Sequence, residues 1–129
     1  AVPWVRDVLD YAVTAVPREK LILGVPAYHY DWQDGTRTAT SGAAHEAVAL
    51  AESLGVPILW DADSQTPYFR YFRDGRWHEV HFEDSRSLRE KLALAQEYQV
   101  RGIAIWRLGY EVPTVWQEIA LWRAGASGR

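Results

Sequence analysis

The sequence predicts an α/β fold in which two buried parallel strands are flanked by helices. Two short apolar runs carry this prediction, residues 21–28 near the start and residues 102–106 near the end. Each run is continuously apolar and too short for a helix, which is typical of strands buried on both faces. Each run also ends on an aromatic residue at its C-terminal end, the side where parallel α/β folds bind their ligands.

The first part of the chain predicts a helix and then the first strand. Pro3 suits the first turn of a helix, apolar residues recur at helical spacing as far as Val16, and Pro17 ends the pattern. Residues 31–40 are polar and contain glycine, so we expect a loop there. Three aromatic residues cluster at the start of this loop: Tyr28, Tyr30 and Trp32.

The middle of the chain predicts a helix, a short strand and a hairpin. Ser41 is a candidate N-cap for a helix over residues 43–54, and Gly55 stands where that helix would stop. A short strand is expected at residues 56–60. The next aromatic runs flank an Asp-Gly pair within residues 67–82, which indicates a β-hairpin.

The last third predicts a helix, the second buried strand and a final helix. Ser87 with Glu90 fits a capping box for the first of these helices, and Asp84 is an alternative cap one turn earlier. After the strand, Pro113 opens the last helix. Residues 125–129 are small and polar, and we expect them to form a frayed tail.

This order of elements resembles the last two β/α units of an eight-stranded α/β (TIM) barrel, with a small antiparallel α+β insertion between them. Two parallel strands alone cannot close a sheet, so a larger barrel is expected. The predicted division is a barrel segment over residues 1–37, the insertion over 38–84, a second barrel segment over 85–124 and a tail over 125–129.

Composition excludes several classes of function. The chain is 48% hydrophobic and 13% aromatic, which is typical of a folded globular protein. A net charge of −3 and the lack of a basic stretch argue against nucleic acid as a partner. No apolar run approaches the ~20 residues that span a membrane. Without cysteine, and with no histidine at ligand spacing to a partner, neither a metal nor a cofactor is expected.

Several segments together resemble glycoside hydrolase family 18, which contains the chitinases and the bacterial spore-cortex and cell-wall N-acetylglucosaminidases. Residues 20–32 are similar to the seventh-strand motif of this family. Residues 82–91 carry its aromatic-acid-acid, Ser and Lys pattern, and residues 60–69 resemble the insertion of the spore-lysin branch. Residues 102–106 resemble the eighth strand, whose terminal Trp forms the floor of the sugar subsite where cleavage occurs. The resemblance covers residues 4–122.

The resemblance implies a hydrolase that acts on β-1,4-linked N-acetylglucosamine polymers, either peptidoglycan or chitin. The family's catalytic signature, D-x-x-D-x-D-x-E on the fourth strand, has no match in this sequence. We therefore assign no catalytic residue, expect the chain alone to be inactive, and expect a missing N-terminal barrel portion as its partner. Because the two barrel strands would leave unpaired edges, we also expect self-association. An extracellular, cell-envelope or spore-coat location is implied by the family.

Four aromatic residues are the candidate substrate-binding residues: Trp106, Tyr28, Tyr30 and Trp32. Spacing alone favours a core position for Trp106, whereas the resemblance implies the subsite floor, for which an indole offers a flat apolar face and one N–H donor. Tyr28 could be structural or could line the cleft. Two other functions stay open: a non-catalytic, lectin-like carbohydrate-binding barrel, and an interaction module whose aromatic residues are core.

Overall fold

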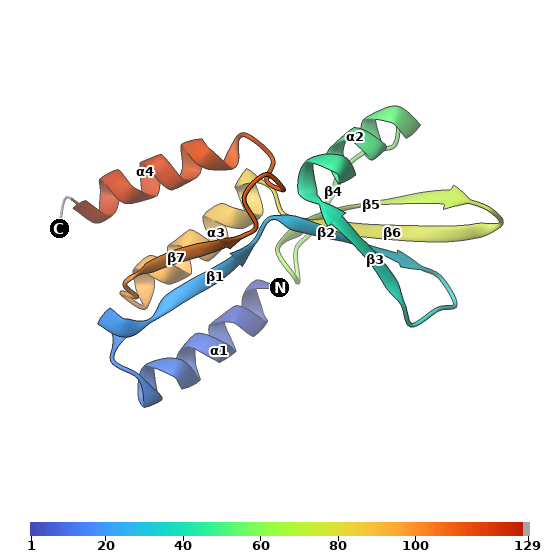
Figure 1. The fold of residues 1–129 in the computed structure, drawn as a ribbon. Coiled ribbons are helices and arrows are strands. Elements are labelled where there is room, and N and C mark those ends of the chain that lie inside the picture. Colours follow the sequence, from blue (N-terminus) through green and yellow to red (C-terminus); the bar gives the residue numbers. More distant parts are fainter. Residues whose placement is uncertain (128–129) are drawn as a thin grey trace.

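The structure, a computed structural model, describes residues 1–127 and arranges their strands in two separate sheets. One is a two-stranded parallel sheet flanked by three helices. The other is a five-stranded antiparallel sheet with one helix on it. Figure 1 shows the two parts side by side, joined where β1 continues into β2. Among the described residues, no helix is both long and apolar enough to cross a lipid bilayer.

The parallel sheet consists of the two apolar runs that the sequence singles out. β1 (Ile22–Pro26) pairs in parallel with β7 (Gly102–Trp106), with Ile22 opposite Gly102 and Pro26 opposite Trp106. This pairing confirms the predicted parallel strands. The surrounding helical elements are α1 (Val2–Ala15), η1 (Arg18–Lys20), α3 (Ser85–Glu97) and α4 (Val115–Ser127).

Only one face of the parallel sheet is covered. Leu23 and Val25 are buried against α1, α3 and α4, where Leu9, Leu88 and Leu92 complete the core. The side chains on the other face are small or exposed: Ile22 and Trp106 are exposed, and a Cβ added to Gly24 would meet nothing within 4 Å. The continuous apolar pattern of β1 and β7 is typical of strands that are buried on both faces, whereas in this structure one face of the two strands is exposed.

The antiparallel sheet has the order β3-β2-β6-β5-β4. Its elements are β2 (Tyr28–Gln33), β3 (Ala39–Ala43), α2 (Ala44–Leu54), β4 (Leu59–Asp61), β5 (Thr66–Arg73) and β6 (Arg76–Phe82). The β5–β6 hairpin confirms the prediction, because Asp74 and Gly75 both have the positive φ that a tight hairpin turn requires. Small residues of α2 pack against Phe69 and Val80 to form the core of this sheet.

The predicted loop over residues 31–40 is too long, because residues 31–33 belong to β2 and residues 39–40 belong to β3, which leaves residues 34–38 as the connection. Its polar residues occupy partly exposed strand positions, and the backbone of β2 is paired on both sides, with β3 and with β6. Ser41 consequently lies within β3 and is not the N-cap. Ala43 takes that place, and the Glu46 carboxylate accepts the Ala43 N–H at 3.0 Å in lieu of a capping side chain.

Three further boundaries differ from the sequence prediction. The short strand begins at Leu59, so residues 56–58 precede it. Asp84, the alternative cap, is the N-cap of α3 and accepts the Ser87 N–H at 2.9 Å. Helix α4 continues to Ser127, so the tail expected from residue 125 begins too early, and residues 128–129 lie outside the described residues. The division at residues 37 and 38 stays a prediction, and the antiparallel sheet includes β2, which precedes residue 38.

Candidate functional site

One buried residue, Ala27, separates β1 of the parallel sheet from β2 of the antiparallel sheet. Its N–H donates to the backbone oxygen of Trp106 at 2.8 Å, and its own oxygen accepts the N–H of Ala44 at 3.1 Å. The joint is thus bonded both to β7 and to the start of α2. As a result, Tyr28 emerges beside the C-terminal end of β7, where Trp106 stands.

An open cleft of about 430 Å³ lies at this junction. It is lined by Tyr28, Tyr30, Ser41, Trp106, Arg107 and Tyr110. A second hollow of about 350 Å³, between β1 and the start of α1, shares Tyr28 and Trp106 with the first and also touches Lys91. Both volumes fall in the range of small-molecule sites, and both lie at the carboxyl ends of the parallel strands.

Three of the four predicted site residues line the cleft. The Trp106 side chain is 70% exposed, so it is not the core residue that spacing alone favours. The Tyr28 and Tyr30 rings meet edge to face with centroids 5.4 Å apart. Trp32 is not among the lining residues, but its ring lies 6.1 Å from that of Tyr30 on the same face of β2. Substrate binding by these four residues stays a prediction.

Two further lining residues come from the loop after β7, and sequence reasoning gave them no role in the cleft. Arg107 donates to the Tyr110 hydroxyl at 2.8 Å, and its guanidinium stacks 4.3 Å from that ring. The His45 side chain on α2 forms a hydrogen bond with the backbone oxygen of Gly109, which holds the loop against α2. The sequence signal that could have indicated this loop is Gly109, because a glycine after a strand is typical of a tight turn. In the structure Gly109 has φ +89°, and the loop folds back toward the cleft.

Glu111 fixes the same loop from within. Its carboxylate accepts the backbone N–H of Gly109 at 2.7 Å and the indole N–H of Trp116 at 3.2 Å. Hydrogen bonds from its own backbone N–H and from that of Gly109 lower the pKa of Glu111, so the side chain is ionised at neutral pH. Each carboxylate oxygen of Glu111 thus has a structural hydrogen bond within the loop.

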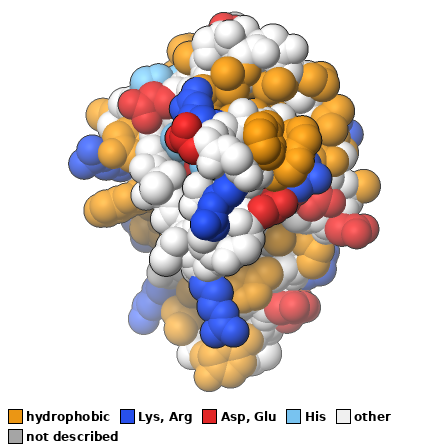
Figure 2. Space-filling model, turned by 90° about the vertical axis from the view of Figure 1, so that its right-hand side faces the viewer, with side chains coloured by type: hydrophobic (Ala, Val, Ile, Leu, Met, Phe, Trp, Pro, Cys, Tyr) orange, Lys and Arg blue, Asp and Glu red, His pale blue; other side chains and the backbone are white. Residues whose placement is uncertain are grey.

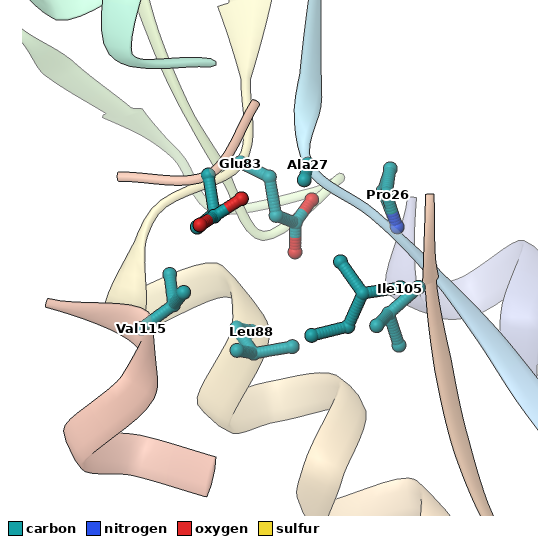
Figure 3. Close-up of a pocket in the computed structure, with 8 residues that line it drawn as sticks. Pro26, Ala27, Glu83, Leu88, Ile105 and Val115 are labelled. Carbon is teal, nitrogen blue, oxygen red and sulfur yellow. The ribbon is translucent and has the colours of Figure 1, made fainter. Parts of the chain in front are cut away.

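A buried ion pair lies behind the cleft. The Lys91 ammonium donates to both carboxylate oxygens of Glu83 at 2.7 and 3.0 Å, and the two residues are only 2% and 4% exposed. Burial raises the pKa of Glu83, and the Lys91 charge limits that rise. Figure 3 shows the Glu83 side chain among Ala27, Leu88 and Ile105, at a cavity of about 10 Å³ that could hold at most one water.

The remaining acidic residues that could suggest acid-base chemistry have local structural roles. The Asp61 carboxylate accepts the Ser64 hydroxyl at 2.5 Å and the Asp63 N–H at 3.0 Å, and the hydrogen bond from Ser64 lowers the pKa of Asp61. Asp84 caps α3. Within residues 1–127, no three His, Cys, Asp or Glu side chains are grouped to hold a metal ion.

Comparisons with known proteins agree on one family. Residues 4–111 match the model for glycosyl hydrolases family 18. The cortical fragment-lytic enzyme of Bacillus subtilis is 38% identical over 117 residues, which are 87% of this chain and 27% of the relative. Human di-N-acetylchitobiase is 30% identical over 120 residues, 75% of this chain and 31% of the relative.

Solved structures of a spore cortex-lytic enzyme and of a chitinase also resemble this chain. The Bacillus megaterium spore cortex-lytic enzyme SleL matches with a TM-score of 0.81 and 41% identity, over 90% of this chain and 28% of that one. A chitinase from Chromobacterium violaceum matches with a TM-score of 0.86 and 32% identity, over 95% and 39%. The predicted fold class is confirmed, and the chain spans roughly a quarter to two fifths of these relatives. The chain belongs to glycosyl hydrolases family 18.

Proposed function

We propose that this chain supplies part of the substrate cleft of a glycoside hydrolase that acts on β-1,4-linked N-acetylglucosamine polymers, peptidoglycan or chitin. One observation carries the proposal: the exposed Trp106 indole stands with Tyr28 and Tyr30 around an open cleft at the carboxyl ends of two parallel strands. Relatives that are named for cortex lysis, chitinase and chitobiase activity support this substrate class.

The cleft offers the two kinds of contact that a sugar needs. Trp106 presents a large apolar face to the C–H surface of a pyranose ring. Around it, the hydroxyls of Tyr28, Tyr30 and Ser41 can donate to or accept from sugar hydroxyls and the N-acetyl group. Burial raises the pKa of Tyr28, so its hydroxyl stays protonated and remains a donor at neutral pH.

We expect binding without hydrolysis by the chain alone. Family 18 enzymes are substrate-assisted, so the protein supplies the acid that protonates the leaving oxygen while the substrate supplies the nucleophile. The sequence contains no D-x-x-D-x-D-x-E run. The carboxylates of Glu83 and Glu111, which do not line the cleft, accept hydrogen bonds from Lys91 and from the Gly109 N–H. The proton donor would therefore come from the missing barrel portion.

Two finer parts of the proposal concern partners and location. Within residues 1–127, β1 and β7 pair only with each other, and their open face exposes Ile22 and Trp106. Such edges and faces recruit other chains, so the isolated chain should self-associate. A strictly monomeric particle in sedimentation at high concentration would contradict this expectation.

The expected place of action is outside the cell, at the cell envelope or the spore coat, where its polymer lies.

Titration of tryptophan fluorescence with N-acetylglucosamine oligomers tests the proposed function. The unmodified chain should bind the oligomers. Trp106→Ala should abolish most of the fluorescence change and most of the affinity. Tyr11→Ala is the matched control, because Tyr11 is an aromatic residue of similar exposure (75%) on α1 that lines neither hollow. Equal binding by both variants would refute the assignment of the cleft.

A further inference from the structure

The charge of the cleft comes from one side chain, Arg107. Within residues 1–127, the other side chains that line the cleft are neutral: Tyr28, Tyr30, Ser41, Trp106 and Tyr110. Arg107 follows Trp106 directly in the chain and is exposed, so its guanidinium faces the solvent of the cleft. A ligand that rests on the Trp106 indole therefore has a positive charge among its immediate neighbours.

This charge has no counter-charge beside it. In the described part of the chain, no carboxylate forms an ion pair with Arg107. Three other arginines differ in this respect, because Arg6, Arg70 and Arg89 each lie against an acidic side chain. Lys/Arg and Asp/Glu side chains are likewise interspersed on the face of the molecule that Figure 2 shows. An unmatched cation in a cleft attracts anionic ligands.

Two acidic residues belong to neighbouring parts of the structure, and both are committed to other partners. Glu111, in the same loop as Arg107, accepts two N–H groups of that loop and of the helix after it. Glu83 is buried and accepts both of its hydrogen bonds from Lys91. Neither carboxylate can turn to Arg107 without giving up these hydrogen bonds, so the guanidinium stays available to a ligand.

The orientation of the guanidinium is set by Tyr110. Arg107 donates to the Tyr110 hydroxyl at 2.8 Å and stacks 4.3 Å from the ring centroid. The backbone of Tyr110 is held in turn, because its oxygen accepts the N–H of His45 at 3.3 Å. A guanidinium has five N–H donors, and one of them is used here. The free donors include a parallel pair, which matches the two oxygens of a carboxylate.

This arrangement distinguishes between the two polymers that the proposed function leaves open. Chitin consists of N-acetylglucosamine alone and is uncharged. In the glycan strand of peptidoglycan, every second sugar carries a lactyl ether, whose carboxyl group is either free or extended by a peptide that ends in a carboxylate. A neutral sugar chain leaves the charge of Arg107 unmatched, whereas an acidic substituent supplies the partner that the described residues do not.

We propose that Arg107 is a specificity-determining residue that binds a carboxylate of the substrate, so that the cleft prefers acidic, muramic acid-containing glycans to chitin. Tyr110 is the positioning residue that orients the guanidinium. The proposal rests on the proposed function, because Trp106 must hold a sugar for its acidic substituent to reach Arg107. Recognition is by charge-assisted hydrogen bonds from the guanidinium to the carboxylate oxygens.

Calorimetric titration with three tetrasaccharides tests this proposal. The first alternates N-acetylglucosamine with N-acetylmuramic acid and has free lactyl carboxylates. The second is the same glycan with these carboxylates converted to amides, and the third is the N-acetylglucosamine tetramer. At low salt the unmodified chain should bind the acidic glycan about tenfold more tightly than the amide, the scale of one hydrogen bond to a charged group. The preference should shrink at higher salt, because ions screen an exposed pair.

Variants of Arg107 separate charge from shape. Arg107→Gln should reduce the ratio of the two affinities to about one, because glutamine keeps an N–H donor but has no charge. Arg107→Lys should keep part of the preference, because it keeps the charge without the parallel pair of donors. Arg101→Gln is the matched control and should keep the full preference, since Arg101 is exposed, precedes the other end of β7 and lines neither hollow.

The remaining outcomes separate this inference from the proposed function. Equal binding of the acidic glycan and its amide by the unmodified chain refutes the role of Arg107 and leaves the cleft intact. A preference that persists in Arg107→Gln also refutes it, because the carboxylate is then bound elsewhere. Loss of the preference in Arg101→Gln as well shows a general charge effect and refutes it too. If none of the three glycans binds the unmodified chain, the proposed function fails together with this inference.

Discussion

Replacement of Lys91 by methionine should cost this chain a large part of its stability. The substitution keeps most of the side-chain volume but leaves the Glu83 carboxylate buried with no cation beside it. Breaking a buried pair from one side typically costs about 3–5 kcal/mol. With a urea m-value of about 2 kcal/mol/M for a chain of this size, the midpoint should fall by about 2 M.

The loss should depend on pH in a defined direction. Burial raises the folded-state pKa of Glu83, and removal of the Lys91 charge raises it further. Stability from a raised carboxyl pKa is fully present below the unfolded value of about 4.3 and is lost as the pH rises through the folded value. The deficit of Lys91→Met should therefore be smaller at pH 5 than at pH 7.

Urea denaturation followed by tryptophan fluorescence measures these effects. Arg89→Met is the matched control, because Arg89 lies on the same helix and also makes a bidentate ion pair, with Glu118, but on the surface. It should leave the midpoint nearly unchanged. Glu83→Leu combined with Lys91→Met should recover most of the loss. The reasoning is refuted if Lys91→Met resembles Arg89→Met, or if the double variant is as unstable as the single one.

Three other predictions concern the fold around the site. Gly42→Ala should lower the free energy of unfolding by about 1–3 kcal/mol, because a Cβ there would lie 2.7 Å from the Glu46 carboxylate. Gly102→Ala is the control and should leave the free energy of unfolding unchanged, because its Cβ would meet nothing within 4 Å. Thermal denaturation compares the two variants. Asp84→Ala should remove the α3 cap at about 1 kcal/mol, measured by urea denaturation. Spectrophotometric titration should show one tyrosine with a pKa of about 12, absent from Tyr71→Phe, because burial and a hydrogen bond to a carboxylate raise it.

The strands that the sequence predicts correctly are those with strong local signals. The apolar runs at residues 21–28 and 102–106 and the Asp74-Gly75 turn can each be recognised from their local residue pattern alone, although the two runs form strands by pairing with each other. The loop expected over residues 31–40 is too long because β2 is held by pairing with β6, which lies more than 40 residues away in the chain, and β3 then pairs with β2. Pairing of this kind leaves little mark on a single sequence.

The candidate site shows the same division. Trp106 and Tyr28 follow from their position at the ends of the buried runs, and the structure brings both into one cleft. Arg107 and Tyr110 do not follow from periodicity, since they depend on a loop that is anchored by His45 and Glu111.

The single-residue joint at Ala27 explains how an insertion can be tolerated so close to the cleft. Because both its N–H and its carbonyl are bonded, to β7 and to α2, the two sheets cannot rotate about this point without breaking both hydrogen bonds in a buried place. The separation of Tyr28 and Trp106 is therefore set by the backbone before any ligand arrives. Such preorganisation reduces the entropy that binding must overcome.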